Sequence, residues 1–105
     1  ATAATAELAL GLLLAAARHI PAADASMRDG RFQQGVPAGI VLEGRTLGVI
    51  GLGKIGARMA RSGAALGMHV LAWSQNMTPE AAQASGARLV SKDELLAQSD
   101  AVSLH

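Results

Sequence analysis

Residues 46–56, with the sequence TLGVIGLGKIG, decide the fold of this chain. A short apolar run leads into three glycines at the spacing G-x-G-x-x-G, and an amphipathic segment follows. This pattern predicts a buried strand, a tight turn and the opening of a helix. Gly51 permits the turn out of the strand, Gly53 lets another group approach the backbone closely, and Gly56 allows the helix to pack on the sheet.

The residues on either side of the turn favour a ligand site. A helix predicted over Lys54–Leu66 is followed by a second apolar strand, His69–Trp73, which completes a strand–helix–strand unit. Unpaired N–H groups and the positive dipole end at the start of a helix attract anions. We therefore predict that the turn binds the diphosphate of a dinucleotide; the alternative is a tight turn without a ligand. The predicted binding residues of the turn are Gly51, Leu52, Gly53, Lys54, Ile55 and Gly56.

The residues after the second strand bear on the choice of coenzyme. An acid there would accept hydrogen bonds from the ribose hydroxyls, and an arginine would attract a 2′-phosphate. This chain has Ser74, Gln75 and Asn76 instead. Their side chains can hydrogen-bond either a ribose or a phosphate. We predict that they contact the coenzyme, and their identity leaves both NAD and NADP open.

The sequence of the rest of residues 46–105 predicts two further helix–strand units. Thr78 is the predicted N-cap of a helix that ends at Gly86, and residues 87–90 form a short third strand. Ser91 and Glu94 form a predicted capping box for a helix at 92–98, with Leu95 and Leu96 turned inward. Residues 100–105 form the fourth strand. We predict an α/β, Rossmann-type domain with a parallel sheet of about four strands in the order 3-2-1-4, truncated at an open fourth strand.

The N-terminal part of the chain is different in character. Residues 2–20 are rich in Ala and Leu and predict a long helix that is apolar on nearly all sides. Such a helix needs either another subunit or a missing domain as a partner, or burial within its own domain. Pro21 ends or kinks it, and Phe32 is predicted to anchor the packing of the connector that follows. We divide the chain into an interface helix at 1–30, a linker at 31–45 and an incomplete dinucleotide-binding core at 46–105.

Composition limits the function classes. The chain has 105 residues, no cysteine and a formal net charge of +1. It therefore offers no thiol chemistry and no basic run for nucleic acid. The three histidines lie in different segments, so we expect no metal site. The apolar run at 8–17 is too short for a membrane span and lacks the flanks of a signal peptide. We expect a cytoplasmic protein, and the two ends look like those of a fragment.

The order of these motifs resembles the D-isomer-specific 2-hydroxyacid dehydrogenases, the family of phosphoglycerate, glycerate and hydroxypyruvate-type reductases. The run 42–56 looks like the family's nucleotide-binding signature, and the likeness covers essentially the whole chain. The segments that carry it on either side are TAELALGLL at 5–13, GMHVLAW at 67–73, DELL at 93–96 and SDAVSLH at 99–105.

The resemblance implies hydride transfer between a nicotinamide coenzyme and C2 of a small 2-hydroxy or 2-oxo acid. The family's catalytic arginine, acid and histidine fall beyond His105, so no catalytic residue is assigned here. His105 itself matches a histidine on the nicotinamide side of the cleft that does not transfer the proton, and we predict it as a coenzyme contact. The long first helix implies a homodimer. The chain alone is expected to bind NAD(H) or NADP(H) weakly, without turnover.

Three other functions remain in view. A nucleotide-sensing module without chemistry would also lack catalytic residues. A Rossmann-type methyltransferase is disfavoured, because no acid follows the second strand to hold a ribose. The hypothesis of a purely structural interaction protein is supported by the apolar first helix alone.

Overall fold

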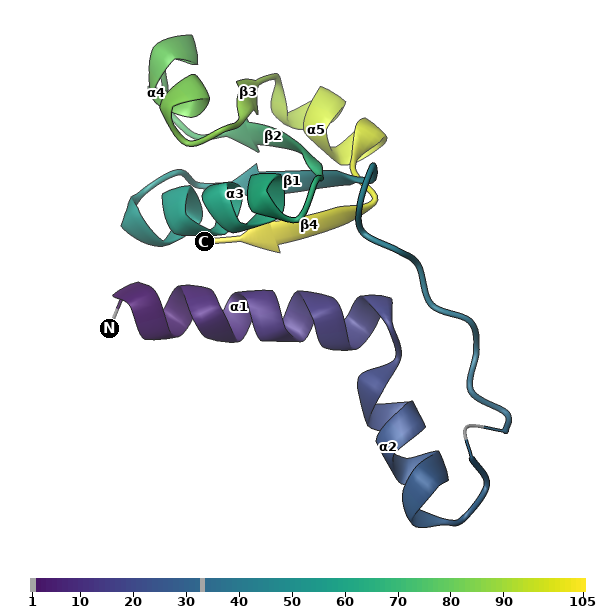
Figure 1. The fold of residues 1–105 in the computed structure, drawn as a ribbon. Helices are drawn as coiled ribbons and strands as arrows, with labels where there is room; N and C mark the ends of the chain where they lie inside the picture. Colours follow the sequence, from purple (N-terminus) through teal and green to yellow (C-terminus); the bar gives the residue numbers. More distant parts are fainter. Residues whose placement is uncertain (1, 33) are drawn as a thin grey trace.

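The computed structural model of the protein describes residues 2–32 and 34–105 and shows helices alternating with the strands of one sheet (Figure 1). All strand pairs are parallel, and the strand order is β3-β2-β1-β4. The predicted α/β class and strand order are confirmed. In chain order the elements are α1 (Thr2–Ala17), α2 (Ile20–Arg28), β1 (Thr46–Ile50), α3 (Lys54–Ala65), β2 (His69–Trp73), α4 (Pro79–Ala84), β3 (Arg88–Leu89), α5 (Lys92–Gln98) and β4 (Ala101–Leu104).

The register of the sheet brings three strand ends together. Ile50 at the end of β1 pairs with Trp73 at the end of β2 and with Leu104 at the end of β4. Hydrogen bonds continue past these ends, from Gly51 N–H to the Trp73 carbonyl (2.8 Å) and from His105 N–H to the Ile50 carbonyl (2.9 Å). The segments that follow parallel strands thus meet at one edge of the sheet. We call residues 50–56, 73–76 and 104–105 the carboxyl edge.

The core has two apolar clusters on opposite faces of the sheet. Along β2, Val70 and Ala72 belong to one cluster and Leu71 to the other, as the alternation of side chains along a strand requires. The first cluster holds the fully buried Leu47 and Met59, and parts of α1 pack against it. The second is built around Leu95 of α5.

A glycine on α3 lets this helix lie close to the sheet. A Cβ on Gly63 would come within 2.7 Å of Leu47 Cδ2 and 3.3 Å of Val70 Cγ2. The α3 backbone therefore takes the space that a side chain would fill, which suits a core built from small and branched residues.

The N-terminal helix is shorter than predicted. α1 ends at Ala17, and His19 adopts a left-handed conformation (φ 52°), so that α2 begins at Ile20, ahead of Pro21. Pro21 therefore lies in the first turn of α2, where its missing N–H has no helical partner to lose. The two helices are bent by 66°. We call α2 with residues 29–32 and 34–39 the projection, because Figure 1 shows them extending away from the sheet.

α1 divides its apolar residues between two environments. One side packs against the sheet cluster through Leu10, Leu13 and Leu14, with Ala6 buried. On the other side Leu8 and Leu12 remain 64% and 63% exposed. Burial within the domain therefore explains one face of this helix and leaves the other without a cover among the described residues.

None of the described helices is long and apolar enough by itself to cross a bilayer. Only α1 and α2 taken together have the length and composition of a membrane span, and they are separated by the 66° bend.

Three local predictions need correction. Phe32 was expected to anchor the connector, but it is 78% exposed and has a left-handed backbone (φ 51°). Leu96 was expected to point inward, but it lies on the exposed side of α5. In the predicted capping box Ser91 Oγ accepts from Glu94 N–H (3.1 Å), whereas the Glu94 carboxylate lies 3.7 Å from the Arg88 guanidinium. The Glu94 side chain thus contacts a charged group of β3, and not the backbone N–H of Ser91 as the capping box predicts.

β4 forms one border of the sheet. It pairs with β1 on one side only, and no strand of the described residues lies on its other side. Leu104 near its end is 76% exposed. The predicted open edge at the fourth strand is therefore present in this structure.

Candidate functional site

The glycine turn after β1 is held in shape by backbone contacts. Gly51 has φ 89°, and a Cβ on it would collide with the carbonyl oxygen of His105. A Cβ on Gly56 would collide with the carbonyl oxygen of Gly51. Backbone atoms cannot move aside as a side chain end can, so glycine is required at both positions. The backbone of the turn therefore packs closely against both the start of α3 and the end of β4.

Gly53 occupies the open side of the same turn. Its backbone is extended (φ −76°, ψ −161°), and a Cβ on it would meet no atom within 4 Å. The space above Gly53 is therefore free for a ligand that approaches the backbone closely. This arrangement suits a diphosphate, for which a side chain here would be an obstacle.

The first turn of α3 supplies donors toward this space. α3 has 12 residues, and the residue before it, Gly53, offers no side chain to cap the free N–H groups. The leading N–H groups of a helix have no partner within it and carry the positive end of its dipole. A hollow of about 380 Å³ adjoins them. Its lining residues are Thr2, Gly53, Lys54, Ile55, Gly56 and His105.

Five of the ten residues that are predicted to contact the coenzyme line this hollow. Leu52 is half-buried and packs against the apolar core, so its contribution to a ligand would be through its backbone. Thr2 was missed by the sequence analysis. It reaches the hollow because α1 packs along α3, and nothing in the sequence near Thr2 indicates that approach.

The charged and titratable groups around the hollow are few. Lys54 is exposed and forms no ion pair with the described residues. Such a cation can approach a phosphate without first breaking another contact. His105 Nε2 lies 2.6 Å from Ser103 Oγ, so one ring nitrogen already contacts a side chain of β4. This pair lacks a carboxylate partner in the described residues, and we assign it no catalytic role.

Ser74, Gln75 and Asn76 lie next to the glycine turn along the carboxyl edge. The Gly51 N–H to Trp73 carbonyl bond joins the two segments directly. After β2 the chain makes a turn in which Met77 N–H donates to the Ser74 carbonyl (3.3 Å) and Asn76 is left-handed (φ 64°). A dinucleotide with its diphosphate at Gly53 would extend its adenosine ribose toward this turn.

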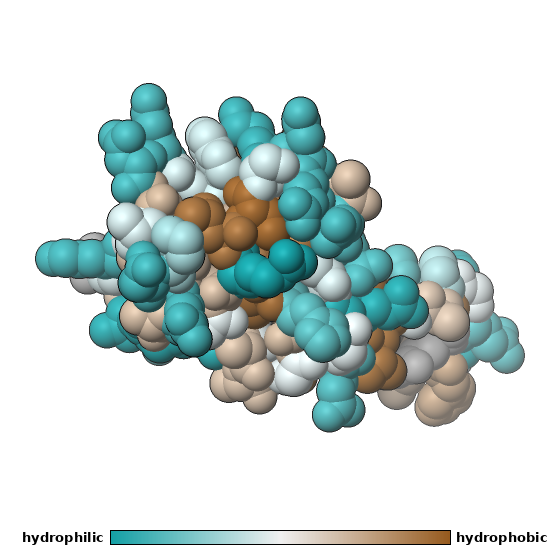
Figure 2. Space-filling view, turned by 90° about the horizontal axis from the view of Figure 1, so that it is seen from above, coloured by the Kyte–Doolittle hydropathy of each residue, from teal (hydrophilic) through white to brown (hydrophobic). Residues whose placement is uncertain are grey.

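A larger hollow lies at the other end of the strands. Its volume is about 600 Å³, and Thr46 and His69, the first residues of β1 and β2, line it together with Arg88. Figure 2, seen from the side of α4 and α5, shows an apolar area bordered by polar side chains on this face of the molecule. Because this hollow is remote from the glycine turn, volume alone does not locate the site. The described residues contain no group of three His, Asp or Glu side chains that could hold a metal ion.

Comparison with known proteins agrees with this geometry. Residues 10–105 match the model of the "D-isomer specific 2-hydroxyacid dehydrogenase, NAD binding domain". The chain is 46% identical over 104 residues to a D-3-phosphoglycerate dehydrogenase of Archaeoglobus fulgidus, covering 99% of this chain and 20% of that protein. It is 40% identical over 111 residues to a glyoxylate reductase of Thermococcus litoralis, covering 99% of this chain and 34% of that protein.

A solved structure gives the same result in three dimensions. The crystal structure of a phosphoglycerate oxidoreductase from Vibrio cholerae O395 superimposes with a TM-score of 0.92 at 41% identity, covering 100% of this chain and 34% of that one. The chain thus spans between a fifth and a third of the length of these relatives. Sequence, strand order and the glycine turn agree, and the chain belongs to the D-isomer specific 2-hydroxyacid dehydrogenase family, whose NAD-binding domain it carries.

Proposed function

We propose that the full-length protein is an NAD(P)-dependent oxidoreductase that interconverts a D-2-hydroxy acid and a 2-oxo acid. The observation that carries this proposal is the cradle at Gly51–Gly56, where backbone packing fixes the turn and leaves open space above Gly53. Family membership supplies the reaction class. The catalytic groups are not assigned to any of the 105 residues.

In this proposal the chain's own residues bind and orient the coenzyme. The N–H groups at the start of α3 hold the diphosphate, and Lys54 adds a mobile positive charge. Ser74, Gln75 and Asn76 contact the adenosine ribose, and His105 borders the nicotinamide end of the cleft. The bound coenzyme supplies the hydride acceptor or donor, and the second substrate is a small 2-hydroxy or 2-oxo acid.

A turnover assay with the full-length protein tests this function. We expect oxidation of reduced coenzyme in the presence of a 2-oxo acid, beginning with glyoxylate and the 2-oxo acid that corresponds to 3-phosphoglycerate. Coenzyme binding without turnover on any 2-oxo acid would instead favour the nucleotide-sensing module. The cytoplasm is the location that we propose, because such an enzyme depends on the coenzyme pool of the cell interior.

We also propose that the N-terminal helices, residues 1–30, form the interface of a homodimer, with residues 31–45 as a linker to the core at 46–105. The exposed surface of the chain is 6446 Å², against about 5,500 Å² for a compact protein of its mass. Because the chain spans only a fifth to a third of the length of its relatives, this excess is surface for the rest of the protein and for a second copy together. The radius of gyration of 15.2 Å also exceeds the compact value of about 13 Å.

The surface that fits this dimer is apolar. Leu8, Leu12, Ile20 and Met27 are each about half exposed or more. A hollow of about 400 Å³ lies at the bend between α1 and α2, lined by Leu12, His19 and Pro21 with three alanines. A second copy could fill this hollow with an exposed apolar side chain of its own. The same patch would then be used on both subunits, as two-fold symmetry requires.

Sedimentation of the full-length protein tests the dimer. Leu12→Asp removes an exposed apolar side chain and adds a charge, so we expect a shift from dimer to monomer with the fold intact by circular dichroism. Leu96→Asp, on the exposed side of α5, is the matched control and is expected to leave the dimer unchanged. Dimerisation unaffected by Leu12→Asp would place the interface elsewhere.

A further inference from the structure

The turn after β2 lacks the group that selects a free ribose. In dinucleotide folds, an acidic residue at this position hydrogen-bonds the ribose 2′-hydroxyl, and a basic group nearby accommodates a 2′-phosphate. Ser74, Gln75 and Asn76 offer a hydroxyl and two amides, all of which can donate to a phosphate oxygen. No negative charge in this turn would repel a 2′-phosphate.

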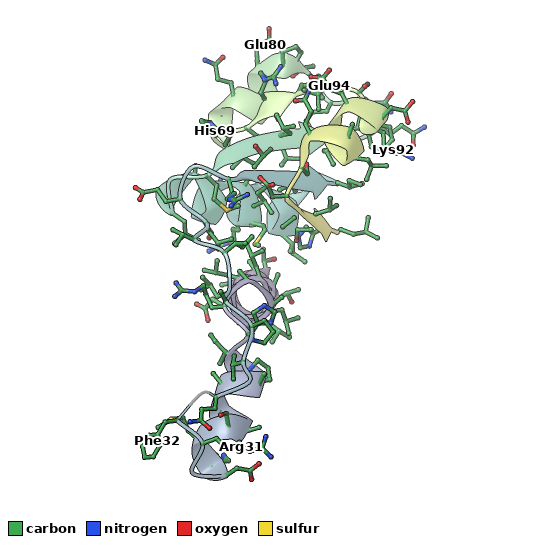
Figure 3. The ribbon with its side chains drawn as sticks, turned by 90° about the vertical axis from the view of Figure 1, so that its right-hand side faces the viewer. Arg31, Phe32, His69, Glu80, Lys92 and Glu94 are labelled. Atoms are coloured by element: carbon green, nitrogen blue, oxygen red, sulfur yellow. The ribbon has the colours of Figure 1, made fainter. Side chains whose placement is uncertain are left out.

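A cation from another segment of the chain lies over Trp73, the residue that precedes this turn. Lys92, the first residue of α5, places Nζ 4.6 Å from the centroid of the Trp73 ring. Trp73 ends β2, and Ser74 follows it directly. The approach arises because β3 runs parallel beside β2, with Val90 N–H donating to the Ala72 carbonyl (3.1 Å). Figure 3 places Lys92 and His69 at opposite ends of the sheet, with Lys92 on the side where the strands end.

The charge of Lys92 is available for a ligand. The neighbouring carboxylate of Glu94 is engaged by the Arg88 guanidinium at 3.7 Å. Within residues 2–32 and 34–105, Lys92 forms no ion pair. Asp93 is exposed, and the solvent screens its charge. The indole face holds the lysine by a cation–π interaction, so the ammonium group stays near the end of β2.

We propose that the coenzyme of this protein is NADP(H) and that Lys92, with Ser74 beside it, binds the 2′-phosphate. The inference rests on the proposed function, because it takes the glycine turn as the diphosphate site. The Gly51 N–H to Trp73 carbonyl bond fixes the two sites side by side. A 2′-phosphate would give Lys92 an anionic partner, whereas the uncharged 2′-hydroxyl of NAD(H) would give it none.

Calorimetric titration of the full-length protein with NADPH and with NADH tests the proposal. We expect NADPH to bind at least about tenfold more tightly, because a charge-assisted contact accounts for a factor of this size. Lys92→Gln should weaken NADPH binding by about tenfold and leave NADH binding unchanged. Lys92→Arg, which keeps the cation, should retain the preference. Arg61→Gln, which removes an equal charge from the exposed side of α3, is the control for net charge.

A second pair of probes tests the contribution of the 2′-phosphate without the nicotinamide. Adenosine 2′,5′-bisphosphate should compete with NADPH more strongly than adenosine 5′-monophosphate does, and Lys92→Gln should abolish that difference. Equal affinity for the two coenzymes, tighter binding of NADH, or an equal loss for both in Lys92→Gln would overturn the inference while leaving the diphosphate site intact. Failure of both coenzymes to bind would instead overturn the proposed function itself, and this inference with it.

Discussion

The carboxyl edge and the projection use the same residue type for different reasons. Gly51 at the carboxyl edge and Gly35 in the projection both have left-handed backbones, with φ of 89° and 80°. Around Gly51 a Cβ would strike the His105 backbone, whereas around Gly35 it would meet nothing within 4 Å. The comparison teaches that packed backbone fixes the shape of the carboxyl edge. At Gly35 in the projection only local turn geometry does so.

This difference corresponds to the two roles that we propose. A diphosphate cradle must hold its N–H groups in place before the ligand arrives, and a rigid turn meets that need. A surface that binds a second copy of the chain needs exposed apolar side chains, which become buried only when the partner is present. Figure 3 shows Phe32 and Arg31 at the far end of the projection, away from the sheet.

Paired substitutions of Gly51 and Gly35 by alanine test the comparison most strongly. Gly51→Ala should lower the free energy of unfolding by about 3 kcal/mol or more, since it combines a left-handed residue with a backbone clash. Gly35→Ala should cost about 1 kcal/mol, from the left-handed conformation alone. Urea unfolding of both variants measures the difference. Similar losses in the two would mean that packing around Gly51 adds nothing.

Gly53→Ala separates stability from binding within the carboxyl edge. Alanine can adopt the extended backbone of Gly53, and its Cβ meets no protein atom, so the midpoint of thermal unfolding should move by no more than about 2 °C. Coenzyme affinity should nevertheless fall by about tenfold or more, because the Cβ enters the space left for the diphosphate. Unchanged affinity would mean that the diphosphate does not occupy this space.

The smallest effects compare a local side-chain contact beside the sheet with one in the projection. Ser91→Ala removes the cap of α5, where Ser91 Oγ accepts from Glu94 N–H, and should cost about 1 kcal/mol. Asp24→Ala removes the exposed ion pair with Arg28 in α2, 2.9 Å long, and should cost only about 0.3 kcal/mol. Chemical unfolding of the two variants should preserve this order, and a reversed order would contradict the view that the projection is the more loosely held region.

The sequence was most informative where local chemistry and packing agree. The spacing of Gly51, Gly53 and Gly56 predicts the strand, the turn and the helix, and together with the later apolar runs it predicts the strand order. The Thr78 and Ser91 caps were also predicted, and both hydroxyls accept the expected backbone N–H groups. Apart from the strand order, each of these features depends on residues close together in the chain, which is where sequence patterns carry most information.

Most of the misses depend on contacts between distant segments. The break at His19 requires a histidine in a left-handed conformation, which few sequence signals indicate. Thr2 reaches the coenzyme hollow only through the packing of α1 on α3. Lys92 meets Trp73 only because β3 runs beside β2. The exposed position of Phe32 follows from the direction of the projection, which composition does not encode.

The bare side of β4 has a practical consequence for handling this polypeptide. A strand border that pairs with no further strand of the described residues, and that exposes Leu104, is a template for joining strands from other molecules. Concentrated solutions of the 105 residues by themselves are therefore expected to become turbid on storage. A lysine in place of Leu104 should delay that clouding, as charged residues do at natural sheet borders.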